Sequence, residues 1–143
     1  MILYADTSAL VKKYMLESGS DQVLAFFAGF QVIGTATLTL VEMAAAMAKA
    51  VRQGWVDEPA MRLAWQDFLA HWPAYSRLPV SNTTVERAAS LAWQHGLRAY
   101  DALHLASALV WKEAMGEEAI FACFDKRLNQ AGKAAGLHAW PES

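Results

Sequence analysis

The sequence contains little of what disulfide-bonded, zinc-binding or membrane proteins need. Cys123 is the only cysteine among 143 residues, which excludes an internal disulfide and zinc sites built on paired cysteines. The four histidines show no HxH or HxxxH spacing. No run approaches the ~18 apolar residues of a membrane span, and Asp6 interrupts the N-terminal apolar run before a secretory signal forms. We therefore expect a cytoplasmic protein without membrane association.

A strong net charge is also missing. Twelve Lys and Arg residues stand against 14 Asp and Glu residues, which gives a formal net charge of −2. That balance argues against a DNA-packaging role and leaves a local nucleic-acid site open. Apolar residues make up 55% of the chain, which is enough for a sizeable core. With no repeats, low-complexity tracts or linkers, residues 1–143 are expected to form one domain.

Short apolar runs alternate with longer stretches of helical periodicity. The runs at 2–5, 31–36, 76–80 and 119–123 have the length and boundaries of strands. Strands separated by helices need crossover connections, which favour a mainly parallel sheet covered on both faces. The sequence therefore predicts an α/β domain with a central sheet of four to five strands. The expected helices are 7–17, 20–28, 100–115 and 126–135, with three more that end at Gly54, Pro73 and Gly96.

Four acidic residues stand where helices are expected to begin, namely Asp6, Glu42, Asp101 and Asp125. Asp6 and Asp125 directly follow predicted strands, and Glu42 opens the helix after the strand 31–36. Ligands of parallel sheets bind beyond the carboxyl ends of the strands. Carboxylates gathered there repel one another unless a cation joins them, and oxygen-only ligand sets suit Mg²⁺ or Mn²⁺. The pattern predicts a metal-dependent enzyme.

Each acid also has a plain structural explanation. Asp6 and Asp125 fit helix N-caps, and Thr39 with Glu42 has the spacing of a capping box. Asp101 fits this explanation least, because it heads the most apolar helix, where an unpaired carboxylate is costly. Convergence of all four on one rim favours a shared cation over four independent caps.

Four motifs, in order along nearly the whole chain, resemble those of the PIN-domain ribonucleases, and most closely the VapC-type toxins of prokaryotic toxin–antitoxin pairs. They span residues 6–10, 39–42, 100–106 and 124–128. The resemblance implies the PIN fold and Mg²⁺- or Mn²⁺-dependent endonucleolytic cleavage of RNA. It also implies a homodimer and a small antitoxin that offers a basic side chain to the acids. One departure is Cys123, which stands where many relatives carry Thr or Ser.

The resemblance makes the four acids the catalytic, metal-binding quartet. Phosphodiester hydrolysis needs an activated water, charge neutralisation and a stabilised leaving oxygen, all of which bound metal supplies. One metal ion and two remain alternatives. We expect Asp6 and Asp101 to bind metal directly, and Glu42 and Asp125 to bind it directly or through water. Ser8 is expected to orient a ligand or contact phosphate, or else only to make hydrogen bonds at the helix start.

Basic residues flank the acids and are candidates to hold RNA phosphates. A solvated face is the alternative interpretation, above all for a single lysine. His104, one turn after Asp101, is predicted to be a hydrogen-bonded core residue and is given no catalytic role. The basic candidates are Lys12, Arg98, Lys126 and Arg127.

Other classes of protein fit less well. A haloacid-dehalogenase-type phosphotransferase needs a second acid two residues after Asp6, where Ser8 stands, and a receiver domain needs paired acids near the first strand. A non-catalytic PIN-fold binding module and a housekeeping RNA-processing nuclease remain as alternatives. One helical stripe is either a partner surface or plain core; it consists of Met61, Trp65, Phe68 and Trp72.

Overall fold

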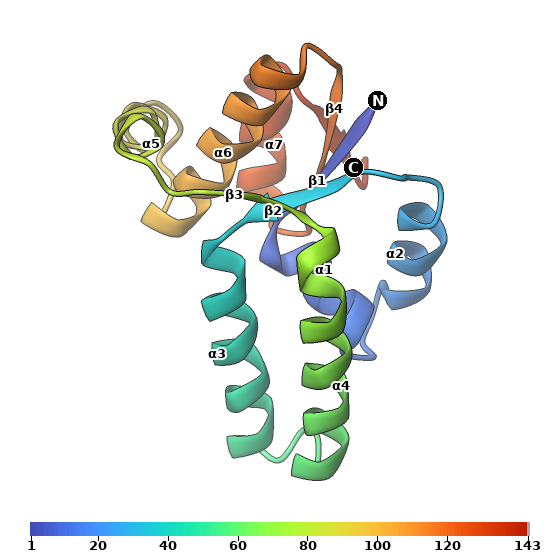
Figure 1. Cartoon of the computed structure of the whole chain (residues 1–143). Helices are drawn as coiled ribbons and strands as arrows, with labels where there is room; N and C mark the ends of the chain where they lie inside the picture. The colour runs from blue at the N-terminus through green and yellow to red at the C-terminus, as the bar shows by residue number, and fades with distance from the viewer. Residues whose placement is uncertain (143) are drawn as a thin grey trace.

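Five parallel strands form the central sheet in the computed structural model, which describes residues 1–142 (Figure 1). The order across the sheet is β3-β2-β1-β4-β5. β1 lies at the centre, with β2 and β3 on one side and β4 and β5 on the other, so the strand order reverses between β1 and β4. The strands are β1 (Ile2–Ala5), β2 (Ile33–Ala36), β3 (Ser76–Leu78), β4 (Ala119–Ala122) and β5 (His138–Trp140).

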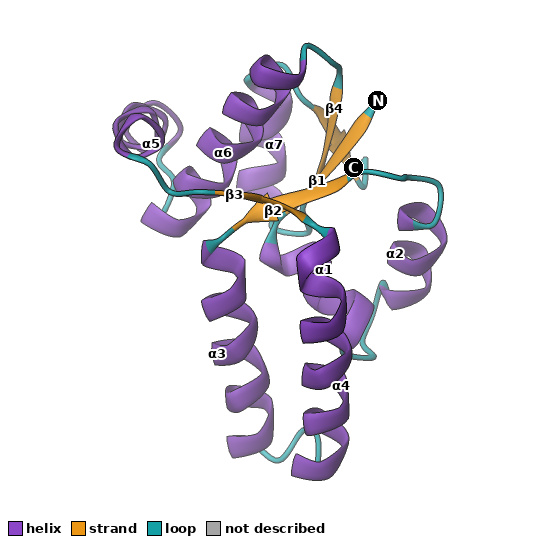
Figure 2. Cartoon of the chain, viewed as in Figure 1, coloured by secondary structure: helices purple, strands orange, loops and turns teal. Residues whose placement is uncertain are grey.

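Helices cover both faces of this sheet (Figure 2). Successive side chains of a strand point to opposite faces. Ile2 and Tyr4 of β1 therefore join the core under α5, α6 and α7, whereas Leu3 and Ala5 join the core formed with α1 to α4. The helices are α1 (Thr7–Tyr14), α2 (Ser20–Phe27), α3 (Leu38–Arg52), α4 (Glu58–His71), α5 (Asn82–His95), α6 (Ala99–Met115) and α7 (Lys126–Ala134), with a 3₁₀ turn at Trp72–Ala74.

The predicted fold class is confirmed, and the sheet is parallel throughout. Most predicted elements are present with ends that differ by a few residues; the first helix, for example, ends at Tyr14. The strand at His138–Trp140 was not predicted in the sequence. Its three residues are half-buried or exposed, and their extended conformation comes from pairing with β4. A run this short carries no periodicity of its own.

Two predictions about the middle of the chain have clear outcomes. The stripe on α4 is mainly core, because Met61 and Phe68 are buried and Trp65 and Trp72 pack against the same cluster. The capping box is wrong, because α3 begins before Thr39, whose hydroxyl instead lies 2.7 Å from that of Thr35. Glu42 is therefore free of any capping role.

α3 and α4 stand side by side and project away from the sheet (Figure 1). Asp57 caps α4 by accepting a hydrogen bond from the Ala60 backbone amide at 2.9 Å, as predicted. Within residues 1–142, every helix is too short or too polar to cross a membrane.

Candidate active site

Two of the predicted acids lie at the ends of adjacent central strands. β1 and β4 pair in register up to Ala5 and Ala122, and the Asp6 backbone amide donates to the Ala122 carbonyl at 3.1 Å. Asp6 follows β1 and begins α1, while Asp125 follows β4 and begins α7. Both acids thus lie at the carboxyl edge of the sheet, where the strand order reverses.

Asp6 is a buried carboxylate, with 4% of its surface exposed. Its Oδ1 accepts hydrogen bonds from the Ser8 hydroxyl at 2.7 Å and from the Ala9 backbone amide at 3.1 Å. Burial raises the pKa of Asp6 above its ordinary value, although these hydrogen bonds act in the opposite direction. A buried acid of this kind is stabilised in its charged form by a nearby cation.

Ser8 connects the two strand ends. Besides donating to Asp6, its Oγ accepts a hydrogen bond from the Phe124 backbone amide at 2.9 Å. The Cys123 thiol lies beside it, 3.9 Å from the Ser8 Oγ and 3.5 Å from the Asp125 carbonyl oxygen. Burial raises the pKa of Cys123 well above its usual range, so this side chain is a neutral thiol.

Glu42 reaches the same edge from α3. Its Oε1 lies 2.6 Å from the Thr7 hydroxyl and 2.6 Å from Nε2 of His104. Although burial acts to raise the pKa of Glu42, these hydrogen bonds hold it below its ordinary value. His104 is 2% exposed, which confirms that it is a hydrogen-bonded core residue.

A guanidinium group joins the other two acids. Arg98 donates through Nε to Asp101 at 3.0 Å and through Nη2 to Asp125 at 3.3 Å. Asp101 lies in the first turn of α6, and Asp125 also caps α7 by accepting from the Leu128 amide at 3.0 Å. Asp125 and Asp6 are thus N-caps, a role that leaves the predicted metal-binding role of their carboxylates open.

Contacts bring the four acids to one edge of the sheet in two groups, with Glu42 bound to Thr7 beside Asp6, and Asp101 joined to Asp125 by Arg98. Residues 1–142 contain no group of three or more His, Cys, Asp or Glu side chains that is arranged to hold a metal ion. Arg98 instead supplies positive charge between Asp101 and Asp125. Carboxylate oxygens, one of them buried with a raised pKa, nevertheless fit a hard divalent cation chemically.

The four basic candidates differ in how they are engaged. The ammonium group of Lys12 donates to the Ser18 carbonyl at 2.6 Å and to Glu17 at 3.0 Å. Arg127 donates to the Gly96 carbonyl at 3.0 Å. Lys126 is exposed in the first turn of α7, next to Asp125. Arg98 is paired with two acids, yet 77% of its side chain is exposed, so Arg98 and Lys126 lie at the surface beside the acids.

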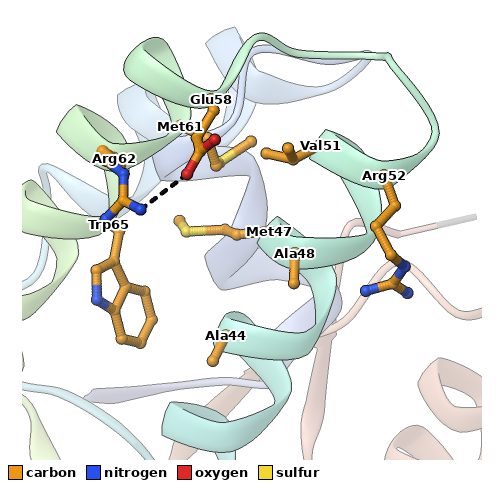
Figure 3. Close-up of a pocket in the computed structure, with 9 residues that line it drawn as sticks. All are labelled: Ala44, Met47, Ala48, Val51, Arg52, Glu58, Met61, Arg62 and Trp65. Carbon is orange, nitrogen blue, oxygen red and sulfur yellow. Dashed lines mark hydrogen bonds and ion pairs between the residues drawn. The ribbon is translucent and has the colours of Figure 1, made fainter.

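A groove lies between α3 and α4 (Figure 3), and Met61 and Trp65 of the stripe that was predicted to be a partner surface or core line it. Its volume is about 350 Å³, and none of the four acids lines it. An ion pair between Glu58 and Arg62, 2.7 Å long, lies at its rim. Apolar side chains of both helices face it, a pairing that helical periodicity alone does not show. The lining residues are Ala44, Met47, Ala48, Val51, Arg52, Glu58, Met61, Arg62 and Trp65.

The parallel sheet, its strand-order reversal and the acidic edge define an α/β domain with a candidate divalent-metal site. The PIN domain family matches residues 3–134. The chain is 34% identical over 141 residues to Ribonuclease VapC45 of Mycobacterium tuberculosis (strain CDC 1551 / Oshkosh), which covers 98% of this chain and 95% of that protein. The chain therefore belongs to the PIN domain family and, within it, to the VapC ribonucleases.

Solved structures share the same fold at low sequence identity. FitAcB from Neisseria gonorrhoeae aligns with a TM-score of 0.70 at 17% identity, covering 93% of this chain and 94% of that chain. A toxin–antitoxin complex from Klebsiella pneumoniae aligns with a TM-score of 0.55 at 19% identity, covering 84% of each chain. At these identities the likeness shows the fold alone.

Proposed function

We propose that the protein is an endoribonuclease that hydrolyses RNA phosphodiester bonds with Mg²⁺ or Mn²⁺ held by its four acids. As a VapC-type ribonuclease, it is the toxin of a toxin–antitoxin pair. The observation that carries the metal assignment is the buried Asp6 at the strand-order reversal, where burial opposes its charge. The acids are Asp6, Glu42, Asp101 and Asp125.

A divalent ion bound by these acids would activate a water and neutralise charge on the phosphate. The protein's own residues prepare the site for it. Ser8 fixes the orientation of Asp6, and Thr7 holds one oxygen of Glu42. Arg98, with 77% of its side chain exposed, is able to leave the acids and contact RNA phosphate.

We assign the groove between α3 and α4 to the antitoxin. Apolar residues line its floor, and Arg52 lies at its edge, whereas Arg62 is paired with Glu58; this suits an amphipathic helix with an apolar stripe and an acidic flank toward Arg52. The Klebsiella pneumoniae neighbour is a toxin–antitoxin complex, which supports a partner of this class. A basic antitoxin side chain is expected to reach the acids and replace Arg98 between them.

A homodimer is also proposed. Trp93 on α5 is 93% exposed, and Val85 on the same helix is 46% exposed. Exposed tryptophan is typical of protein interfaces. Light scattering of the purified protein should give twice the chain mass, and Trp93→Glu should give the single-chain mass.

The nuclease assignment is tested with purified protein and single-stranded RNA. Cleavage should require Mg²⁺ or Mn²⁺ and stop with EDTA, and Asp6→Asn and Asp101→Asn should each lower the rate at least 100-fold, on the order seen when a catalytic group is removed. Circular dichroism checks that the variants fold. Metal binding without cleavage would support the binding-module alternative. Cleavage without growth arrest on expression would support the housekeeping alternative.

A further inference from the structure

We propose that His104, itself hydrogen-bonded to Tyr4, is a positioning residue that orients Glu42. One carboxylate oxygen of Glu42 then accepts hydrogen bonds from the protein, and the other is free to bind the metal. This role rests on the proposed function, because it is directed at the divalent ion that the acids would hold. The three residues come from elements that only the fold brings together, since Tyr4 lies on β1, Glu42 on α3 and His104 on α6.

A chain of hydrogen bonds runs from the core to the acidic edge through the His104 ring. The Tyr4 hydroxyl lies 2.8 Å from Nδ1 of His104, and Nε2 of the same ring lies 2.6 Å from Oε1 of Glu42. A carboxylate oxygen only accepts hydrogen bonds, so Nε2 carries the hydrogen and donates a hydrogen bond to Glu42. In the neutral ring Nδ1 then accepts from Tyr4, so one tautomer satisfies both contacts.

The two oxygens of Glu42 have different surroundings. Oε1 accepts a second hydrogen bond from the Thr7 hydroxyl at 2.6 Å, so two donors occupy both of its lone pairs. Oε2 has no hydrogen-bond partner within the part of the chain that the structure describes. Thr7 directly follows Asp6, so the Thr7 hydrogen bond holds Glu42 at the end of β1, beside Asp6. The carboxylate is held in one orientation with Oε2 available.

The hydrogen-bond chain ends at Tyr4, whose ring lies in a packed aromatic core. The Tyr4 ring stacks on Phe121 with centroids 5.7 Å apart, and the Trp111 ring lies 6.5 Å away. Trp111 in turn packs against the backbone of Gly34, where an added Cβ would lie 2.6 Å from its ring. Tyr4 and His104 are 0% and 2% exposed. A buried, satisfied polar chain of this kind fixes its side chains in place.

A core histidine without influence on the site is the competing explanation. In that case, removal of the imidazole lowers stability and leaves metal affinity unchanged in the folded protein. A positioning residue instead changes metal affinity itself, because partners that orient metal ligands typically contribute about 10–100-fold. Metal affinity measured in folded variants therefore distinguishes the two explanations.

The experiment measures Mn²⁺ affinity by calorimetry on the full chain. His104→Leu removes both polar contacts and should bind Mn²⁺ about 10–100-fold more weakly. His104→Gln, whose amide nitrogen replaces Nε2 as a donor to Glu42, should recover most of that loss. Tyr4→Phe keeps the ring and removes only the hydroxyl, so a smaller loss is expected. Leu109→Ala, a buried truncation on α6, should lower stability and leave Mn²⁺ affinity unchanged.

A second readout is the ¹⁵N NMR spectrum of the His104 ring. The metal-free parent should show protonated Nε2 with slow proton exchange, and Glu42→Gln should change that signal. Parent-like Mn²⁺ affinity in His104→Leu overturns the proposal. If that variant does not fold, parent-like affinity and an unchanged ring spectrum in Tyr4→Phe overturn it. A parent that neither binds Mn²⁺ nor cleaves RNA contradicts the proposed function, and the positioning role with it.

Discussion

Arg98 and Asp101 form an ion pair, 3.0 Å between Nε and Oδ2, at the position where a metal ion is proposed to bind. The same guanidinium reaches Asp125 at 3.3 Å. Arg98 contacts Oδ2 of both acids, and its positive charge would repel a divalent ion placed beside them, so we expect metal and Arg98 to compete for the acids. Displaced by metal, the arginine would be available to RNA phosphate.

Arg98→Ala should therefore affect the affinities for metal and for RNA differently. Mn²⁺ should bind the variant at least as tightly as the parent, because a competing cation is gone. RNA should bind more weakly, and the slope of log affinity against log salt should fall by about one phosphate contact. Calorimetry and salt-dependent RNA binding measure the two effects. Arg87→Ala, which removes an exposed ion pair to Glu113, is the control and should change neither.

Asp6→Asn should remove both the pH-dependent stability that Asp6 contributes and the stabilisation by bound metal. A raised folded-state pKa means that the stability contributed by Asp6 is complete below its unfolded pKa and is lost as pH rises through the folded pKa. Without metal, the free energy of unfolding of the parent should thus fall relative to that of Asp6→Asn as the pH rises above about 4, the ordinary pKa of an aspartate.

Urea unfolding at several pH values, with and without Mn²⁺, tests this. Saturating Mn²⁺ should stabilise the parent, by about 2.7 kcal/mol at 100 times its Kd, and leave Asp6→Asn unchanged. Asp21→Asn on α2, an exposed acid that is not one of the four, should follow the parent at every pH. If the free energy of unfolding of Asp6→Asn falls with rising pH as steeply as that of the parent, Asp6 is not the source of this pH dependence.

Gly34→Ala should destabilise the protein by about 1–3 kcal/mol, the usual range for overpacking. A Cβ on Gly34 would lie 2.6 Å from Cζ3 of Trp111, and a buried indole has little room to move. Gly29→Ala is the matched control, because its added Cβ would meet only the Phe26 carbonyl oxygen at an ordinary 3.5 Å. Equal urea midpoints for the two variants would show that the Trp111 contact is not tight.

Ala48→Arg should block antitoxin binding without affecting RNA cleavage. Ala48 lines the groove between α3 and α4 (Figure 3), and an arginine there would fill it. Ala45→Arg places the same charge on an exposed position of α3 outside the groove. Co-expression with the antitoxin should rescue growth of cells carrying Ala45→Arg and fail to rescue those carrying Ala48→Arg. Rescue of both would exclude the groove as the antitoxin site.

Much of the fold follows from local patterns in the sequence. Short apolar runs and helical stripes in the sequence predict most strands and helices. Each element buries one face, and the spacing of the buried residues along the sequence shows whether the element is a strand or a helix. Asp6 and Asp125 end strands and cap helices, so their place at the carboxyl edge follows once the sheet is parallel. β5 was missed because its extended conformation depends on pairing with β4. The start of α3 was missed because the Thr39 hydroxyl pairs with Thr35 rather than capping the helix.

The sequence by itself determined the class of the domain and the edge of the sheet that carries the acids. Only the tertiary structure decided how the acids are held. His104 contacts Tyr4 across 100 positions of sequence and Glu42 across 62, and Arg98 reaches Asp125 across 27. Periodicity reports which face of an element is buried, whereas such contacts depend on how elements pack against one another. For that reason the partners of each acid became visible only in the folded chain.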